Sequence, residues 1–258
     1  MAGATGLDAA LERFAALDEH ELARPWPFRD KVMDVRYALY RTNEEFQEAA
    51  VRAAARRHAE SRRILSLAQR AFGDLRGLLI GLPADLLDVA PRAGEWPLRE
   101  ILRHIVVVEK RYAVGTCYAV ERADTDPMRV ADGKLPTPAQ VDAAGGIDEV
   151  MARLAAARAE TDRRLGDLPA AAMGRPTQWI QYDVDVRFRL HRFASHLVEH
   201  TIQCEKALAA LNWPMTEGRR IVRRLTALIG EVEGLGGHGE ARRIETRLVE
   251  RSASAATA

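Results

Sequence analysis

Two histidines four residues apart are the first feature of this chain that can do chemistry. His196 and His200 stand within residues 185–211, where apolar side chains recur at helical intervals. At 3.6 residues per turn their Cβ atoms lie about 40° apart around the helix axis, on one face and one turn apart. Two imidazoles so placed can direct a nitrogen at one metal ion, as in helical zinc sites. The pair alone is a weak signal, because surface histidines also fall at this spacing by chance.

A catalytic metal needs at least three protein ligands, so the other histidines are candidates to join the pair. His191 precedes His196 by five residues, about 140° around the helix, and is expected off the site. His104 stands in an apolar helical segment beside Ile105. Its residue type leaves two interpretations open: an interior histidine with its own partner, or a third ligand facing the pair. Three histidines in polar surroundings are expected on the surface: His20, His58 and His238.

The composition predicts an all-α fold, because Ala, Leu, Arg and Glu dominate and alternating β-branched clusters are scarce. With 258 residues, the chain can bury one large core or two small ones. Breakers such as Pro83, Pro91 and Pro214 lie between the periodic segments. We expect helices at 7–16, at 32–82 (one, or two with a kink near 55–60), and at 97–122, 147–165, 185–211, 216–234 and 239–251.

These segments predict a four-helix bundle built from residues 58–82, 97–122, 147–165 and 185–211. Residues 1–57 and 212–258 are then helical extensions that cover apolar bundle surface or form a dimer interface. Within them we expect a loop around Pro25 and Pro27 and a frayed tail after residue 251. Between bundle helices, residues 166–184 are expected to be irregular or partly paired.

Two further segments bear on organisation. Residues 123–145 form a polar loop too long for a bundle turn, which favours an active-site lid or a partner surface. Residues 17–50 also align with 168–201 without gaps, sharing an Arg-Pro pair and the run Asp-Val-Arg-aromatic-x-Leu-x-Arg. In this register Glu45 and Ala49 correspond to His196 and His200. The N-terminal segment is therefore interpreted as a degenerate copy of the histidine helix that lacks the ligands.

Charge and cysteine usage limit the partners and the compartment. The net charge of +1, without a basic stripe, gives no basis for nucleic-acid binding. No apolar run approaches the roughly 20 residues that span a bilayer, so no membrane partner is expected. Two cysteines without a CxxC pair exclude a disulfide framework, and the amino terminus does not resemble a secretory signal. The expected localisation is cytoplasmic.

The run GEWPLREILRHI, residues 94–105, resembles the signature that opens the second helix of the DinB-like superfamily, also called YfiT-like or mycothiol-transferase-like metalloenzymes. The resemblance covers about residues 58–211. Members of that superfamily are four-helix bundles that hold a divalent metal on three histidines, one from the second helix and two from a His-x-x-x-His pair on the last. The resemblance therefore implies a metal site on His104, His196 and His200.

The resemblance also implies a function. Nitrogen ligation suits Zn²⁺ or Ni²⁺, with Mn²⁺, Fe²⁺ and Co²⁺ as alternatives. The implied activity is that of a thiol-dependent S-transferase, in which the metal activates a low-molecular-weight thiol for attack on an electrophile. A metal-dependent hydrolase and a non-catalytic metal-binding stress-response or dimerisation module are the alternatives. Family members are commonly dimeric, which implies a homodimer. Candidates to orient the ligands are Glu109, Glu199 and Gln203.

Overall fold

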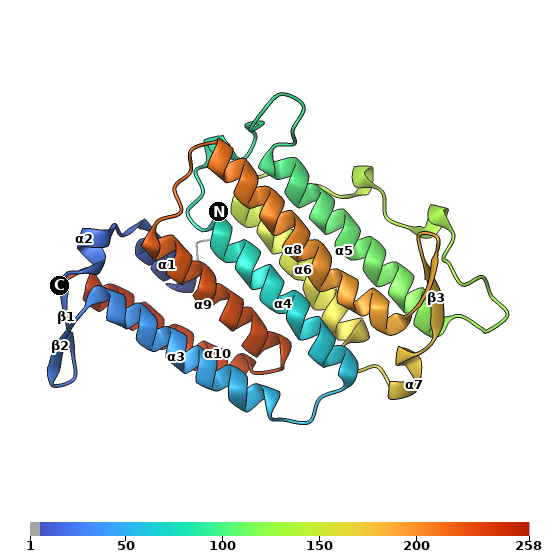
Figure 1. The fold of residues 1–258 in the computed structure, drawn as a ribbon, viewed down its shortest axis with the longest axis horizontal. Coiled ribbons are helices and arrows are strands. Elements are labelled where there is room, and N and C mark those ends of the chain that lie inside the picture. The colour runs from blue at the N-terminus through green and yellow to red at the C-terminus, as the bar shows by residue number, and fades with distance from the viewer. Residues whose placement is uncertain (1–5, 258) are drawn as a thin grey trace.

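The computed structural model describes residues 6–257, and its longest elements are the helices that the apolar periodicity predicts (Figure 1). The long helices are α1 (Gly6–Ala16), α3 (Val35–Ala54), α4 (Glu60–Leu79), α5 (Leu98–Glu121), α6 (Ile147–Leu165), α8 (Val186–Ala210), α9 (Glu217–Gly234) and α10 (His238–Ala255). The short elements are α2 (Glu19–Leu22), α7 (Ala170–Met173), the strands β1 (Pro25–Phe28), β2 (Lys31–Asp34), β3 (Pro176–Trp179) and β4 (Tyr182–Asp185), and the 3₁₀ turns η1 (Ala84–Leu86), η2 (Asp132–Lys134) and η3 (Pro138–Gln140).

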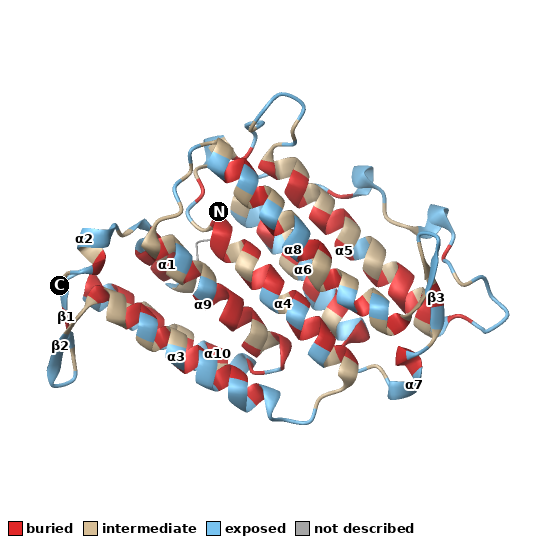
Figure 2. Cartoon of the chain, viewed as in Figure 1, coloured by how far each residue is buried: buried red, intermediate tan, exposed pale blue. Residues whose placement is uncertain are grey.

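Helices α4, α5, α6 and α8 form the expected bundle. They pack around one continuous apolar core, to which buried leucines and valines on the inner face of each helix contribute. Figure 2 shows this arrangement, with buried positions facing between the helices and exposed ones outward. The expected helical fold and the four bundle segments are confirmed, and no observed end differs from the predicted one by more than three residues.

The chain ends come together in a second bundle. Helices α1 and α3 from the N-terminal part pack with α9 and α10 from the C-terminal part around a separate apolar core. Phe14, Phe46, Leu225 and Leu248 are among its fully buried side chains. The two extensions thus bury their apolar stripes mainly against each other, and contact the first bundle through α9 on α4.

The two bundles repeat the same local architecture. Hairpin β1–β2 precedes α3, and hairpin β3–β4 precedes α8, with every strand residue displaced by 151 positions. Each turn contains one residue with positive φ, Arg29 at 55° and Ile180 at 54°. Each following helix is capped by an aspartate whose side chain accepts a hydrogen bond from a backbone N–H three residues on: Asp34 from Tyr37 at 2.9 Å and Asp185 from Phe188 at 2.8 Å.

Glycines bring α4 and α9 into close contact, with the two helices lying side by side (Figure 1). A Cβ added at Gly73 would lie 2.2 Å from the carbonyl oxygen of Thr226. One added at Gly230 would lie 2.3 Å from the carbonyl oxygen of Gln69. The two contacts are related by one offset of 157 positions, which takes Gly73 to Gly230 and Gln69 to Thr226. The two bundles therefore meet through a contact with approximate two-fold symmetry, in which each helix presents a glycine to the backbone of the other.

Two expectations about the extensions need correction, and one pair of alternatives is decided. The region around Pro25 and Pro27 is a hairpin rather than a loop; two prolines on a short, two-stranded sheet do not prevent pairing, because no neighbouring strand needs their missing N–H. Of the two alternatives for the span 32–82, the structure shows two helices, which are separated at residues 55–59. The tail is helical to Ala255, because alanine favours helix and Ser252 is buried and accepts a hydrogen bond from Arg13.

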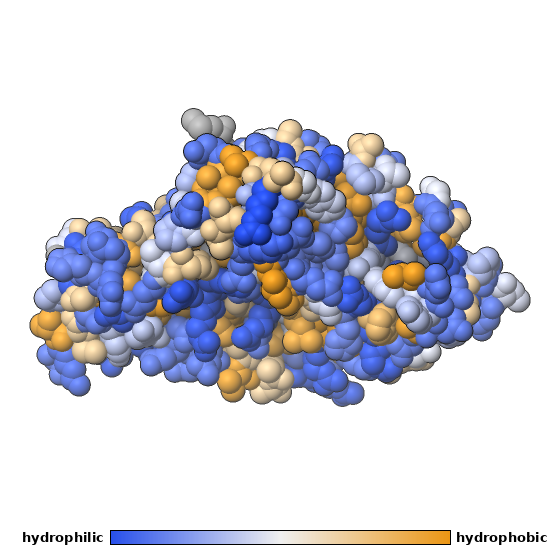
Figure 3. All heavy atoms as spheres, turned by 45° about the horizontal axis from the view of Figure 1, so that its top comes forward, coloured by the Kyte–Doolittle hydropathy of each residue, from blue (hydrophilic) through white to orange (hydrophobic). Residues whose placement is uncertain are grey.

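The long loop and the outer surface complete the fold. Residues 123–145 are held at one side of the first bundle: Thr177 donates to the carbonyl of Met128, and Arg99 donates to the carbonyls of Ala143 and Gly145. Among residues 6–257, no helix is long and apolar enough to cross a membrane. The face in Figure 3 carries mainly hydrophilic side chains, with apolar ones in scattered patches.

Replacing Gly73 by alanine tests the contact between the bundles. The added methyl group meets backbone atoms of α9 that cannot rotate away, so the helices must separate. We expect the free energy of unfolding in urea to fall by about 1–3 kcal/mol, despite the better helix propensity of alanine. Gly174→Ala is the matched control, because a Cβ there meets no atom within 4 Å. Equal stability of the two variants would contradict a tight α4–α9 contact.

Candidate metal centre

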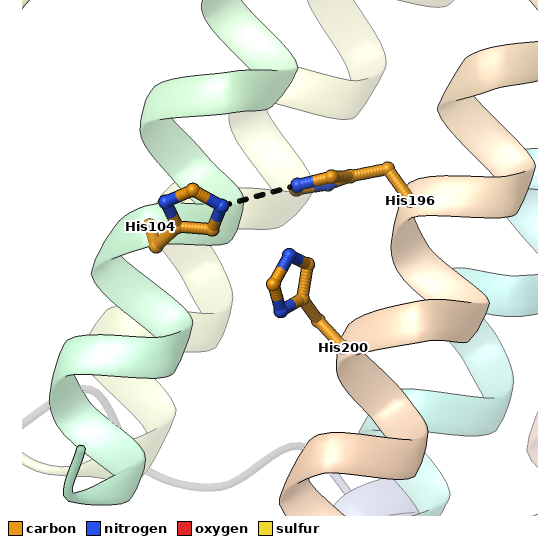
Figure 4. Close-up of side chains that lie close together, drawn as sticks. All are labelled: His104, His196 and His200. Atoms are coloured by element: carbon orange, nitrogen blue, oxygen red, sulfur yellow. Dashed lines mark hydrogen bonds between the residues drawn. The ribbon is translucent and has the colours of Figure 1, made fainter. Parts of the chain in front are cut away.

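The structure brings His104, His196 and His200 together between α5 and α8 (Figure 4). One ligand nitrogen from each ring lies within 4.8 Å of the other two. The Nε2 atoms of His104 and His196 are 3.3 Å apart. The ring centroids are separated by 5.3 Å for His104 and His196, 4.7 Å for His104 and His200, and 4.3 Å for His196 and His200. Three imidazoles from two helices thus converge on one point.

The separation of the nitrogens fits a tetrahedral ion. With bonds of about 2.0–2.1 Å, two ligands of a tetrahedral zinc lie about 3.3–3.4 Å apart. The Nε2 atoms of His104 and His196 already have this spacing, and the ligand nitrogen of His200 lies within 4.8 Å of the other two. The cluster can therefore hold a divalent ion on three nitrogens, with a fourth position left for a non-protein ligand.

Electrostatics keep two of the three imidazoles neutral, which is the form that binds metal. The pKa of His196 is lowered to about 3, mainly by burial and then by the positive charges of His200, His104 and Arg192. Only 7% of His196 is exposed. Burial also lowers the pKa of His104, with smaller contributions from His200 and Arg111. At neutral pH these two rings therefore offer lone pairs rather than protons.

Gln203 orients one of the ligands. Its Oε1 atom lies 2.7 Å from Nδ1 of His200, one turn along α8. The amide oxygen is an acceptor, so Nδ1 of His200 carries the proton and Nε2 keeps the free lone pair. Of the three residues expected to support the ligands, Gln203 is the one that contacts a histidine.

Glu109 and Glu199 are engaged by arginines instead. Glu109 is 3% exposed and accepts hydrogen bonds from Arg158 at 2.8 Å and Thr161 at 2.7 Å, both on α6. Glu199 pairs with Arg192 at 3.0 Å. The role of these two carboxylates beside the ligands stays a prediction, and in the structure each pairs with a guanidinium. His191 is exposed and outside the cluster, as its angular offset predicts.

Two aromatic side chains flank the histidines. The ring of Trp96 lies 5.5 Å from that of His104, and the ring of Tyr112 lies 5.5 Å from that of His196. Tyr112 also packs against Phe193, which fills the bundle on that side. Arg192 precedes His196 by four residues, and this spacing predicts that the two share a face of the helix. No such spacing relates Tyr112 to His196, because Tyr112 lies on α5.

The equivalent position in the second bundle holds ion pairs. Glu45, which corresponds to His196, accepts hydrogen bonds from Arg251 at 2.8 and 3.0 Å and from Arg247 at 3.1 Å. Burial raises the pKa of Glu45, but the hydrogen bonds and charges of these arginines outweigh it, and the net pKa lies below the usual range. Ala49 takes the place of His200. Among residues 6–257, the histidine cluster therefore belongs to the first bundle alone.

This arrangement defines a class of protein: a helical bundle with three convergent histidines from two antiparallel helices. The model of the DinB superfamily matches residues 67–204, just over half of the 258-residue chain and a span that includes all three histidines. The chain belongs to the DinB superfamily, and the resemblance seen in the sequence is confirmed. A search of curated proteins found no match.

Single substitutions test the ligand set. Replacing His104, His196 or His200 by alanine removes one of three nitrogens, so we expect zinc content after loading and gel filtration to fall at least tenfold. The helical circular dichroism should stay unchanged, because the surrounding core is apolar. His191→Ala is the matched control on the same helix and should retain the wild-type zinc content. Full occupancy in His104→Ala would show that the pair has another partner.

Glu109→Gln tests the structural role of that carboxylate. The substitution leaves the guanidinium of Arg158, 1% exposed, with Asp162 as its one remaining counter-ion in place of two. We expect the free energy of unfolding to fall by about 1–3 kcal/mol, with zinc content unchanged at temperatures where the variant is folded. Glu160→Gln, which breaks an exposed pair with Arg163 on the same helix, should cost less than about 1 kcal/mol. Loss of zinc from folded Glu109→Gln would instead place Glu109 at the metal centre.

Proposed function

We propose that this protein is a divalent-metal-dependent enzyme, and that it transfers a low-molecular-weight thiol to an electrophilic small molecule. The observation that carries the proposal is the convergence of three imidazoles with no fourth protein ligand among the described residues. Closed structural zinc sites use four protein ligands, whereas three ligands leave room for a reactant. Zinc or nickel suits the nitrogen set, with manganese, iron and cobalt as alternatives.

A divalent ion bound there would lower the pKa of a thiol or a water molecule that joins it. The chain's own residues prepare for this chemistry. Gln203 fixes the tautomer of His200, so that its Nε2 faces the other two rings. Burial keeps His196 unprotonated, so that no proton has to leave it when an ion binds. Trp96 and Tyr112 cover two sides of the cluster and limit the access of water.

The engagement of the nearby carboxylates favours a thiol over water as the nucleophile. Activation of water at helical zinc sites commonly uses a glutamate as the general base. Here Glu109 is held by Arg158 and Glu199 by Arg192, so neither is free to take a proton without breaking an ion pair. A thiol whose pKa has fallen below 7 loses its proton to solvent and needs no such base.

The homodimer stays a prediction; the glycine face of α4 is already covered by α9, so a second copy would use another surface.

A conjugation assay tests this proposal. Protein loaded with zinc, and separately with nickel, is mixed with monochlorobimane and with cysteine, mycothiol or bacillithiol in turn. We expect at least one thiol to react at least tenfold faster than in the absence of protein, and the acceleration to disappear in His104→Ala. Equal rates for wild type and His104→Ala with every thiol would contradict thiol transfer. Ester hydrolysis that depends on His104 but needs no thiol would support the hydrolase alternative.

A further inference from the structure

A cavity lies beside the histidine cluster, between the start of α5 and the last turns of α8. Its volume is about 290 Å³, and its walls include Trp96, Ile101, Gln203 and Ala207. This is close to the lower end of the range for small-molecule pockets, about 300–1,000 Å³. Its size therefore suits a compact metabolite of the dimensions of an amino acid or dipeptide.

Two of its lining residues also contact the candidate metal ligands. Gln203 bonds to His200, and the ring of Trp96 lies against that of His104. Trp96 is 49% exposed, so it is held less firmly than a core side chain. On the opposite side of the cluster, Tyr112 packs on both His196 and Phe193 and closes the bundle. The cavity is therefore next to the histidine cluster, with Trp96 and Gln203 between the two.

The cavity carries one cation and one anion. Lys206 on α8 and Glu95 in the segment before α5 both line it, and their Nζ and Oε1 atoms are 2.9 Å apart. The side chain of Lys206 is 63% exposed and that of Glu95 is 30% exposed. An ion pair so exposed to water is weak, and a ligand can open it at little cost.

The charges select among ligands. A molecule with both a carboxylate and an ammonium group replaces one ion pair by two, with the carboxylate on Lys206 and the ammonium on Glu95. A molecule with a single charge forms only one new ion pair and leaves the other protein group without a partner. Its gain is therefore offset by the loss of the pair between Lys206 and Glu95. A zwitterion is therefore favoured over either singly charged analogue.

We propose that this cavity binds the α-ammonium and α-carboxylate groups of a small zwitterionic ligand. The inference rests on the proposed function, whose thiol it assigns to the class of cysteine and short cysteine-containing molecules with both termini free. The side chain of such a ligand extends past Trp96 toward the three histidines. Lys206 and Glu95 then determine which thiol is accepted, and the histidines determine what happens to it.

Titration calorimetry with a matched series of compounds tests this inference. S-methyl-L-cysteine carries both charges, its methyl ester carries only the ammonium, and N-acetyl-S-methyl-L-cysteine carries only the carboxylate. Their blocked sulfur prevents thiolate coordination. The full chain is titrated both loaded with zinc and metal-free. We expect the zwitterion to bind with a Kd at least tenfold below that of either analogue in both forms.

Variants at the two charged groups separate their contributions. Lys206→Gln should remove the advantage of the zwitterion over the methyl ester, and Glu95→Gln should remove its advantage over the N-acetyl compound. Glu160→Gln breaks an exposed ion pair outside the cavity and should leave all three Kd values unchanged. Equal Kd values for the three compounds, no binding of any of them, or an unchanged pattern in both cavity variants would overturn the inference.

The conjugation assay and this titration fail independently. If the three compounds bind alike while His104-dependent thiol conjugation is observed, the zwitterion site is contradicted and the transferase proposal is supported. If binding to metal-free protein is charge-selective and no thiol conjugation occurs, the zwitterion site is supported and the transferase proposal is contradicted. The titration therefore tests the cavity by itself.

Discussion

The close contact of α4 with α9 is the constraint on which the rest of this structure depends. Each helix belongs to a different bundle, and each presents a glycine to the other's backbone, so that the two cores are joined without a layer of large side chains between them. The hairpins and the capping aspartates follow the same approximate symmetry. A chain of 258 residues thereby builds two related bundles, one continuous in sequence and the other closed by its two ends.

The two bundles differ in what they place at one equivalent position. In the second, Glu45 is satisfied by Arg247 and Arg251, an arrangement that requires no further partner. In the first, the corresponding His196 faces two more imidazoles, and burial lowers its pKa to about 3. The desolvated rings of His104 and His196 gain nothing from their neighbour, because a positive charge on His200 opposes the protonation of both. Such a locally unfavourable cluster on an otherwise well-packed bundle is expected at a functional site.

The sequence predicted the features that depend on local periodicity. The four bundle segments and the convergence of His196 with His200 follow from a repeat of 3.6 residues, and Pro and Gly marked the ends. The contact of His104 with that pair needed the family resemblance, because 92 positions separate it from His196. The partner of Glu109 was missed for the same reason, since Arg158 lies 49 residues away on α6. The second bundle was seen only as two extensions, because its closure joins the chain's ends through contacts that no local pattern encodes.

Three imidazoles that form a metal site open at the fourth position can be detected by X-ray absorption at the zinc edge of the loaded protein. We expect three nitrogen scatterers at about 2.0–2.1 Å with the multiple-scattering pattern of imidazole, and a fourth light atom at a similar distance. Adding a thiol that is a substrate should replace that light atom with one sulfur at about 2.3 Å. A first shell with fewer than three imidazoles, or one with protein sulfur before any thiol is added, would contradict an open three-histidine site.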